Sequence, residues 1–322
     1  MKILLTGGAG FIGSHIYTAC VNAGHDVTVI DDLSTGCKTN LPADADIRIC
    51  SITDKAQVEK VFAEQQFDIV SHHAAQISVK ESGDNPQRDA EINCIGWLNV
   101  LDSAAKHGCR RIVFASSGGT LYGDVRVPAR EFAPLKPRSP YGITKLAGEQ
   151  YLEVYARKYR METAALRYGN VYGPRQNPHG EAGVVAIFCQ KTLRGQPITV
   201  YGNGTHVRDY VYVDDVVNAN VLAMTSQNIL SGETAPINVG TGVGTYVSII
   251  AHIVQREVVT QFPCTPPNEV HYAPERPDDL KSSMLNPVWA YDKINWRPTT
   301  KVPEGIQKTV AWFGAANEPT QS

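Results

Sequence analysis

Two residues in the segment SPYGITKLAGEQ, Tyr141 and Lys145, have the types and spacing of an acid/base pair. They are four residues apart in a segment with helical periodicity, so both side chains lie on one face and can enter one cavity. The Lys145 ammonium would stabilise a phenolate at Tyr141 and lower the pKa of Tyr141 toward neutrality. The sequence therefore predicts that Tyr141 acts as a general acid/base beside Lys145.

A glycine-rich turn, TGGAGFIG, follows the first hydrophobic run and places Gly7, Gly10 and Gly13 three residues apart. Between a strand and a helix, such glycines allow a tight turn, the approach of a pyrophosphate and close packing of helix on strand. The helix begins near Phe11, where free N–H groups and the helix dipole favour anions. This turn predicts a bound dinucleotide.

An acid, Asp31, ends the next expected strand, 18 residues after Gly13. That is about where a ribose-binding carboxylate belongs in such a unit. A carboxylate accepts hydrogen bonds from the ribose hydroxyls but repels a 2′-phosphate. Asp32 adds a second negative charge, and Lys38 is too far along the loop to reverse the selectivity. We therefore expect NAD, and not NADP, as cofactor.

The elements that must position these residues follow from the alternation of apolar runs and amphipathic stretches. Strands are expected at 2–5, 26–30, 47–50, 68–72 and 111–115, and helices at 12–23, 55–64, 92–107 and 142–159. Strands alternating with helices imply a parallel sheet covered on both faces. The expected fold class is α/β, a doubly wound parallel (Rossmann) sheet.

The pattern changes after Arg160. We expect loops at 170–183 and 264–281, a helix at 184–193, a strand at 198–201 and a helix start at 214–215. The expected cofactor domain comprises residues 1–169 and also about 209–240. A smaller, partly interleaved substrate domain is expected at residues 170–208 and 241–315, followed by a frayed tail at 316–322.

Composition narrows the class of protein. The net charge of −2 shows no basic excess, which disfavours nucleic acid as a partner. No apolar run reaches the roughly 18 residues of a membrane span, and no signal peptide precedes the glycines. Seven scattered cysteines without a CxxC pair suit reduced thiols and predict neither disulfides nor a metal site. A cytoplasmic protein is expected.

Seven motifs together resemble the extended short-chain dehydrogenase/reductase family: TGGAGFIG, HHAAQ, SSGGTLYG, YGITK, LRYGNVYGPRQ, HVRDYVYVDD and INVGTG. Within that family the chain is similar to the UDP-hexose 4-epimerases, from Lys2 to about Phe313. The resemblance implies an NAD-dependent interconversion of UDP-glucose and UDP-galactose through a 4-keto intermediate, with the N-acetylhexosamine pair as a further substrate. It also implies a homodimer in which helices 92–107 and 142–159 of two copies pair.

The resemblance assigns roles residue by residue. The cofactor is assigned to Gly7, Gly10, Phe11, Ile12, Gly13, Asp31, Ile52, Ala74, Ala75, Gln76, Asn93, Lys145 and Tyr168. The UDP-sugar is assigned to Ser117, Tyr141, Asn170, Arg208, Tyr210, Arg276, Asp279 and Ser283. The two arginines suit a fork-shaped grip on the diphosphate. Ser283, seven residues after Arg276, corresponds to the position that limits space at the sugar C2 substituent, and a small residue there admits an acetamido group.

The chain departs from this family at Gly118, where many relatives have a third serine whose hydroxyl assists proton transfer. Ser117 is our choice for that role and Thr120 is the reserve, while Ser116 stays open.

Two other reactions are known on this fold. Nucleotide-sugar 4,6-dehydratases and decarboxylases place acidic residues just before the YG pair, where this chain has Gly118, Gly119 and Thr120, none of which can move a proton at C5. This favours the epimerase. A non-catalytic NAD-sensing protein is disfavoured because it has no need of Tyr141 and Lys145.

Overall fold

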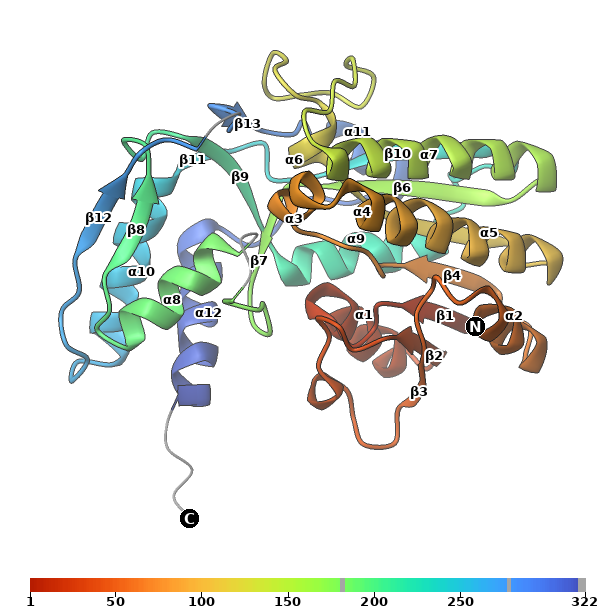
Figure 1. Cartoon of the computed structure of the whole chain (residues 1–322), viewed down its shortest axis with the longest axis horizontal. Coiled ribbons are helices and arrows are strands. Elements are labelled where there is room, and N and C mark those ends of the chain that lie inside the picture. Colours follow the sequence, from red (N-terminus) through yellow and green to blue (C-terminus); the bar gives the residue numbers. More distant parts are fainter. Residues whose placement is uncertain (180–182, 277–278, 318–322) are drawn as a thin grey trace.

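The computed structural model describes residues 1–179, 183–276 and 279–317, and its larger part is built on one seven-stranded sheet (Figure 1). The strands are β1 (Lys2–Thr6), β2 (Asp26–Asp31), β3 (Asp46–Ile49), β4 (Ile69–His72), β5 (Arg111–Ser117), β6 (Glu162–Tyr168) and β10 (Glu233–Val239). Their order is β10-β6-β5-β4-β1-β2-β3, and every neighbouring pair is parallel. The predicted fold class is confirmed.

Side chains of the central strands are buried on both faces of the sheet. In β1, Ile3 and Leu5 belong to one hydrophobic cluster and Leu4 belongs to another. Successive residues of a strand point to opposite faces, so a strand buried on both sides reads as an unbroken apolar run. This is why the strands were recognisable in the sequence as short runs without alternation.

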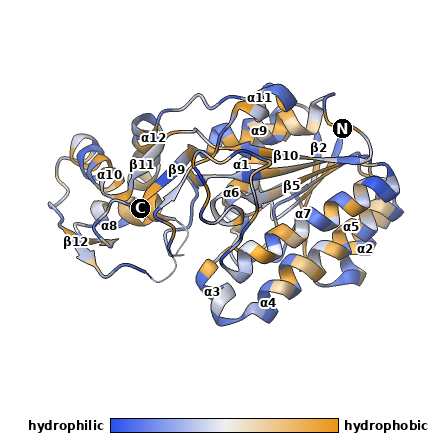
Figure 2. Cartoon of the chain, turned by 90° about the horizontal axis from the view of Figure 1, so that it is seen from above, coloured by the Kyte–Doolittle hydropathy of each residue, from blue (hydrophilic) through white to orange (hydrophobic). Residues whose placement is uncertain are grey.

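Two layers of helices cover the sheet, which lies between them when seen from above (Figure 2). On the face of Ile3 lie α1 (Phe11–Asn22) and α9 (Val213–Thr225). On the face of Leu4 lie α2 (Lys55–Glu64), α5 (Trp97–Lys106) and α7 (Pro140–Tyr159). Ser139 caps α7 by accepting a hydrogen bond from the Gly142 N–H at 3.1 Å, and Pro140 suits its first turn.

The segment before α5 is more complex than the predicted helix at 92–107. It consists of α3 (Val79–Asp84), α4 (Pro86–Ala90) and a π-helical turn, η2 (Glu91–Gly96), that continues into α5. Asn85 caps α4 by accepting a hydrogen bond from the Arg88 N–H. The apolar period of the sequence does not distinguish a π turn from an α turn, and such turns are frequent at functional sites.

The smaller part, at the left of Figure 1, packs beside the carboxyl ends of the main strands. Its strands are β7 (Asn170–Tyr172), β8 (Ile198–Tyr201), β9 (Val207–Tyr212), β11 (Gly244–Tyr246), β12 (Val270–Ala273) and β13 (Ser282–Ser283), and its helices are α8 (Val184–Leu193), α10 (Val247–Gln261) and α12 (Val302–Asn317). Three short elements lie elsewhere: η1 (Lys38–Asn40), α6 (Gly118–Leu121) and α11 (Val288–Ile294).

Three sequence predictions are corrected here. The expected loops 170–183 and 264–281 contain β7 and β12, which pair with β9 and β8. Those partners are distant in sequence, so local composition does not reveal them. The expected tail begins inside α12, which continues to Asn317, and residues 318–322 lie outside the described residues.

One hydrophobic cluster joins the two parts of the molecule. It includes Ile3 and Ile16 beside the main sheet together with Val185, Ala251 and Val310 from α8, α10 and α12. A shared core holds the smaller part against the carboxyl edge of the sheet, which is where ligands bind in open α/β sheets. The division into a cofactor domain and a substrate domain stays a prediction. No helix in the described part of the chain combines the length and apolarity of a membrane span.

Candidate active site

The glycine turn between β1 and α1 has no room for side chains. A Cβ on Gly13 would lie 2.2 Å from the Gly7 carbonyl oxygen, and one on Gly7 would lie 2.6 Å from the Ala74 nitrogen. Gly7 also has a φ of +70°, which disfavours any residue with a side chain. Helix α1 begins at Phe11 without a side-chain cap, so its first N–H groups are available to an anion. The turn fits the pyrophosphate of a dinucleotide.

Asp31, at the end of β2, is buried beside this turn. One carboxylate oxygen accepts a hydrogen bond from the Ala9 N–H at 2.9 Å and the other accepts one from the Leu33 N–H at 2.8 Å. Each oxygen keeps a second lone pair for a ribose hydroxyl. Burial raises the pKa of Asp31, while these two hydrogen bonds lower it. The position and the remaining acceptors fit the predicted ribose contact.

The loop after β4 holds Ala74, Ala75 and Gln76 against the glycine turn. Thr6 Oγ1 accepts a hydrogen bond from the Ala74 N–H at 3.2 Å. The amide of Asn93 accepts from the Gln76 N–H at 2.9 Å and donates to the Gln76 carbonyl at 3.0 Å. Asn93 therefore acts on this loop from η2, in addition to its predicted place near the nicotinamide.

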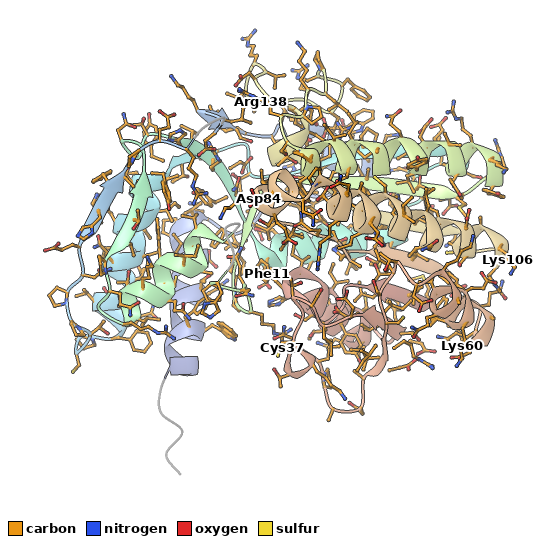
Figure 3. All side chains as sticks on the ribbon, viewed as in Figure 1. Phe11, Cys37, Lys60, Asp84, Lys106 and Arg138 are labelled. Atoms are coloured by element: carbon orange, nitrogen blue, oxygen red, sulfur yellow. The ribbon has the colours of Figure 1, made fainter. Side chains whose placement is uncertain are left out.

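Two further residues assigned to the cofactor are Ile52 and Tyr168. Ile52 is buried beneath η2, where a Cβ on Gly96 would meet its side chain at 2.7 Å. Tyr168 ends β6, and its hydroxyl shares hydrogen bonds of 2.9 and 3.1 Å with Asn220 of α9. Figure 3 labels Phe11, whose position in the middle of the molecule marks the meeting of α1 with the smaller part.

Tyr141 and Lys145 lie on one face of α7, as predicted. The Lys145 ammonium is 5.8 Å from the centre of the Tyr141 ring and donates a hydrogen bond to the Ala115 carbonyl at 2.9 Å. It also lies over the Phe114 ring, 5.1 Å from its centre. The buried ammonium is thus held at the carboxyl end of β5 by α7.

The expected depression of the Tyr141 pKa is not found. Burial raises the pKa of Tyr141, the Asp89 carboxylate raises it further, and a hydrogen bond with Ser117 lowers it. Burial also lowers the pKa of Lys145 to about 8. The sequence prediction counted the attraction between the pair but not the cost of removing both charges from water, which dominates in this pocket.

Of the three open hydroxyls, Ser117 is the one joined to Tyr141. Ser116 points to the other side of β5 and donates a hydrogen bond of 2.6 Å to Glu149 in the core. Thr120 Oγ1 is buried and has no hydrogen-bond partner among the described residues. Gly118 lies against Leu285, which leaves no space for a third serine.

On the substrate side, β7 and β9 bring the assigned residues together. Asn170 pairs with Tyr210 across these strands, and the Asn170 Oδ1 and Ser117 Oγ both lie 4.0 Å from where a Gly119 Cβ would be. Tyr210 is buried, and its hydroxyl has no partner in the described part of the chain. A buried unpaired hydroxyl is costly, so this one is available to a ligand.

Arg208 and Asp279 form a close ion pair, and Arg208 also donates to the Val207 carbonyl at 2.8 Å. Arg276 is exposed and its guanidinium stacks 4.1 Å from the centre of the Tyr201 ring. In this structure the two guanidinium groups thus have different partners, Asp279 for Arg208 and the Tyr201 ring for Arg276. Ser283 pairs with Arg208 between β13 and β9.

The position of Ser283 relative to the reaction centre is defined by a small cavity. With Gly118, Tyr122 and Ser282 it lines a space of about 10 Å³. Ser283 therefore borders the same space as Gly118, the residue that follows Ser117.

Sequence reasoning missed Asp89, a fully buried carboxylate on α4 that joins Gln76, Asn93 and Thr144. The available signal was its spacing, because Asp89 and Asn93 are four residues apart and share a helix face. It also missed the buried pair of Arg167 and Glu149, 2.6 Å apart, which fixes β6 against α7. No group of three or more His, Cys, Asp or Glu in the described ranges could hold a metal ion.

Comparison with known proteins places this site in a family. A family model described as "NAD dependent epimerase/dehydratase family" matches residues 3–240. The UDP-glucose 4-epimerase of Mycolicibacterium smegmatis is 40% identical over 97% of this chain and 98% of its own.

Two solved structures have the same fold throughout. The UDP-glucose 4-epimerase of Thermotoga maritima, solved with UDP-glucose, is 43% identical with a TM-score of 0.92, covering 99% of this chain and 100% of the other. The UDP-glucose 4-epimerase of Thermus thermophilus, solved with NAD, is 44% identical with a TM-score of 0.90, covering 98% and 100%. The matched residues, the shared fold and the glycine turn together show that this chain belongs to the NAD dependent epimerase/dehydratase family.

Proposed function

We propose that this protein is an NAD-dependent UDP-hexose 4-epimerase that interconverts UDP-glucose and UDP-galactose. One observation carries the proposal. Ser117, at the carboxyl end of β5, meets Tyr141 and Lys145, in the first turns of α7, in a fold whose glycine turn fits a dinucleotide. Full-length similarity to proteins named UDP-glucose 4-epimerase supports it.

The chemistry that bound NAD supplies is a reversible hydride exchange with the sugar C4, through a 4-keto intermediate. Tyr141 acts in its phenolate form, which takes the proton of the sugar 4-hydroxyl, becomes a phenol and later returns that proton. Because burial raises the Tyr141 pKa, its own proton must first be released to water, which the Lys145 ammonium and the positive charge of a bound NAD⁺ would favour. Ser117, hydrogen-bonded to Tyr141, holds the same hydroxyl in line for that transfer. Lys145 supplies positive charge beside that phenolate and so stabilises the form that accepts the proton. Arg208 and Asn170 hold the diphosphate, with Tyr210 on the uridine side, while the 4-keto sugar rotates in the site.

The main alternative is another reaction of the same family, dehydration or decarboxylation of a nucleotide sugar. Such chemistry needs a proton-transferring group near C5. Residues 118–120 supply none: Gly118 lies against Leu285, and the space at Gly119 is bordered by Asn170 and Ser117. This favours the epimerase.

The proposal is tested by incubating the purified protein with UDP-galactose and following the products by NMR. We expect UDP-glucose to accumulate to the equilibrium ratio without added cofactor if NAD is retained, or on addition of NAD if it is not. A 4-keto-6-deoxy sugar formed from any nucleotide hexose, or a shortened sugar, would assign the protein to the alternative class.

We further propose activity on the N-acetylhexosamine pair, because Ser283 presents only a hydroxymethyl group at the predicted gate position. A cytoplasmic location is proposed as well. Seven free thiols support it, since reducing compartments preserve them. Fractionation of cells expressing the protein at native level tests the location.

A homodimer is also proposed, formed by α5 and α7. The outward side of this helix pair exposes Ile143 (57%) and Val154 (50%) of α7, with Ile95 of η2 and Tyr151 nearby in the same layer. Isolated apolar side chains on a surface need no explanation, but several along α7 and on the adjoining η2 support a covered face. Pairing with a second copy would bury it.

A further inference from the structure

A fully buried carboxylate, Asp89, lies behind the proposed reaction centre and is not used by the reaction described above. Asp89 Oδ1 accepts hydrogen bonds from Gln76 Nε2 at 2.8 Å and Asn93 Nδ2 at 3.1 Å. Oδ2 accepts one from Thr144 Oγ1 at 2.7 Å. Burying a carboxylate is expensive unless it is bonded and balanced by charge. The three hydrogen-bond donors are neutral, so the negative charge of Asp89 still needs a cation to balance it.

The cation whose charge acts on Asp89 is Lys145, the residue that follows Thr144. Of the charges around Lys145, Asp89 favours its ammonium form most, ahead of Cys94 and Glu149. Reciprocally, Lys145 favours the ionised form of Asp89. These two groups belong to different elements, α4 and α7, and the Thr144 hydrogen bond joins those elements one residue away from the ammonium.

The other groups that face Lys145 do not balance its charge. Glu149 is engaged by Arg167, which donates to both of its carboxylate oxygens. Burial lowers the pKa of His72 and of His73, so both rings are neutral, and burial raises the pKa of the Cys94 thiol.

Two further groups complete the surroundings. Tyr141 carries a phenol whose pKa is raised by burial. Glu81 acts on Asp89 from α3, in the direction that raises its pKa. Among the acidic groups that act on Lys145, Asp89 thus differs in being ionised without a cation bonded to it.

Asp89 also fixes the loop that faces the predicted nicotinamide end. Gln76 is held at its side chain by Asp89 and at its backbone by Asn93, and Asn93 is itself bonded to Asp89. Loss of Asp89 would release both contacts at once.

We propose that Asp89 is a positioning residue of the reaction centre: it is the counter-charge of the Lys145 ammonium and the anchor that holds the Gln76 loop against α7. The proposal deepens the proposed epimerase function and rests on it for its effect on turnover. Its effect on Lys145 does not depend on which reaction the protein catalyses.

The test substitutes Asp89→Asn, which keeps the shape and removes the charge. The new amide oxygen accepts from Gln76 and Asn93, and the amide N–H₂ donates to Thr144 Oγ1. Thr144 in turn redirects its own proton to the Tyr141 carbonyl, which is 3.1 Å away. Asp89→Ser is the second variant, because the space it leaves admits a water that bonds the same donors.

The matched control is Asp215→Asn on α9. Asp215 is also buried and accepts three hydrogen bonds, from the Thr299 N–H, the Thr299 hydroxyl and the Thr300 N–H. It lies outside the proposed site. A general loss of stability would appear in both substitutions, whereas a change at Lys145 is expected only for Asp89.

The first readout is the titration of Lys145 by NMR in protein labelled with ¹³C at lysine Cε, the resonance being assigned by its loss in Lys145→Arg. Without an opposing charge the ammonium loses its proton more easily, so the midpoint falls by about 1 pH unit in Asp89→Asn. It is unchanged in Asp215→Asn. An unchanged midpoint in folded Asp89→Asn and Asp89→Ser overturns the proposal.

The second readout is the pH profile of kcat/KM for UDP-galactose. Because the ammonium form is the one that supports Tyr141, its earlier loss moves the alkaline limb to lower pH in Asp89→Asn, by the same amount as the NMR midpoint. A profile that only falls in height, with its limb in place, also overturns the proposal. If wild-type protein turns over no UDP-hexose, the proposed function fails while the NMR test still decides the role of Asp89.

Discussion

The side chain of Leu285 fills the space in front of Gly118, so that a Cβ on Gly118 would lie 2.6 Å from both Leu285 Cδ atoms. Leu285 is itself fixed, because its N–H donates to Asp209 at 3.1 Å and its side chain is buried. The glycine at position 118 and the leucine at 285 are therefore a matched pair, and the missing third serine has a steric cause.

Gly118→Ser is expected to destabilise the protein by about 1–3 kcal/mol, the usual cost of overpacking a filled space. Leu285→Ala alone should also destabilise it, by leaving a cavity. Because the smaller side chain removes the clash, the double variant should lose less than the sum of the two single losses. Urea unfolding of all four proteins measures this, and strictly additive losses would contradict the pairing.

Tyr141→Phe is expected to lower kcat by about 10² to 10⁴-fold, because it removes the proposed general acid/base. NAD binding should persist, which the nucleotide released on denaturation reports. Tyr151→Phe, on the same helix but exposed, is the control and should leave kcat unchanged. Turnover at the wild-type rate in Tyr141→Phe would rule out the mechanism.

Ser117→Ala is expected to lower kcat by about 10-fold, the value of one hydrogen bond of roughly 1.4 kcal/mol made in the transition state. Thr120→Ala should have a smaller effect. Ser116→Ala should change the unfolding free energy more than the rate, since Ser116 bonds Glu149. Steady-state kinetics and thermal unfolding separate the three, and a rate loss confined to Thr120→Ala would make Ser117 the wrong choice.

Ser283→Tyr should remove activity on UDP-N-acetylgalactosamine, by at least about 100-fold in kcat/KM, while largely sparing UDP-galactose. The reason is steric, because a ring beside the sugar C2 leaves no room for an acetamido group. Ser283→Ala, which keeps the side chain small, is the control and should retain activity on both sugars. Wild-type protein that converts UDP-galactose but no acetamido sugar would refute the open gate.

The double variant Ile143→Glu/Val154→Glu should convert a dimer into a monomer, because it places two charges on the apolar side of α7. Light scattering after size exclusion measures the mass. Val259→Glu, on the exposed side of α10, is a control with a comparable exposed valine and should remain dimeric. A monomeric wild-type protein at micromolar concentration would contradict the proposed interface.

Local spacing and composition were enough to predict the doubly wound sheet, the dinucleotide turn and the shared helix face of Tyr141 and Lys145. In each case the residues concerned lie in one element or in two consecutive elements, so their spacing along the sequence determines how they are placed relative to one another.

The tertiary structure alone decided the rest. That Ser117 and not Ser116 is hydrogen-bonded to Tyr141 depends on how the end of β5 meets α7, because Ser116 is held by Glu149 further along the same helix. Leu285 reaches Gly118 from a segment that is remote in sequence. The direction of the Tyr141 pKa depends on how much water the fold excludes, and Asp89 acquires its importance only when α4 packs against α7. Burial and charge pairing between distant segments are properties of the packed molecule, and no local pattern of residues encodes them.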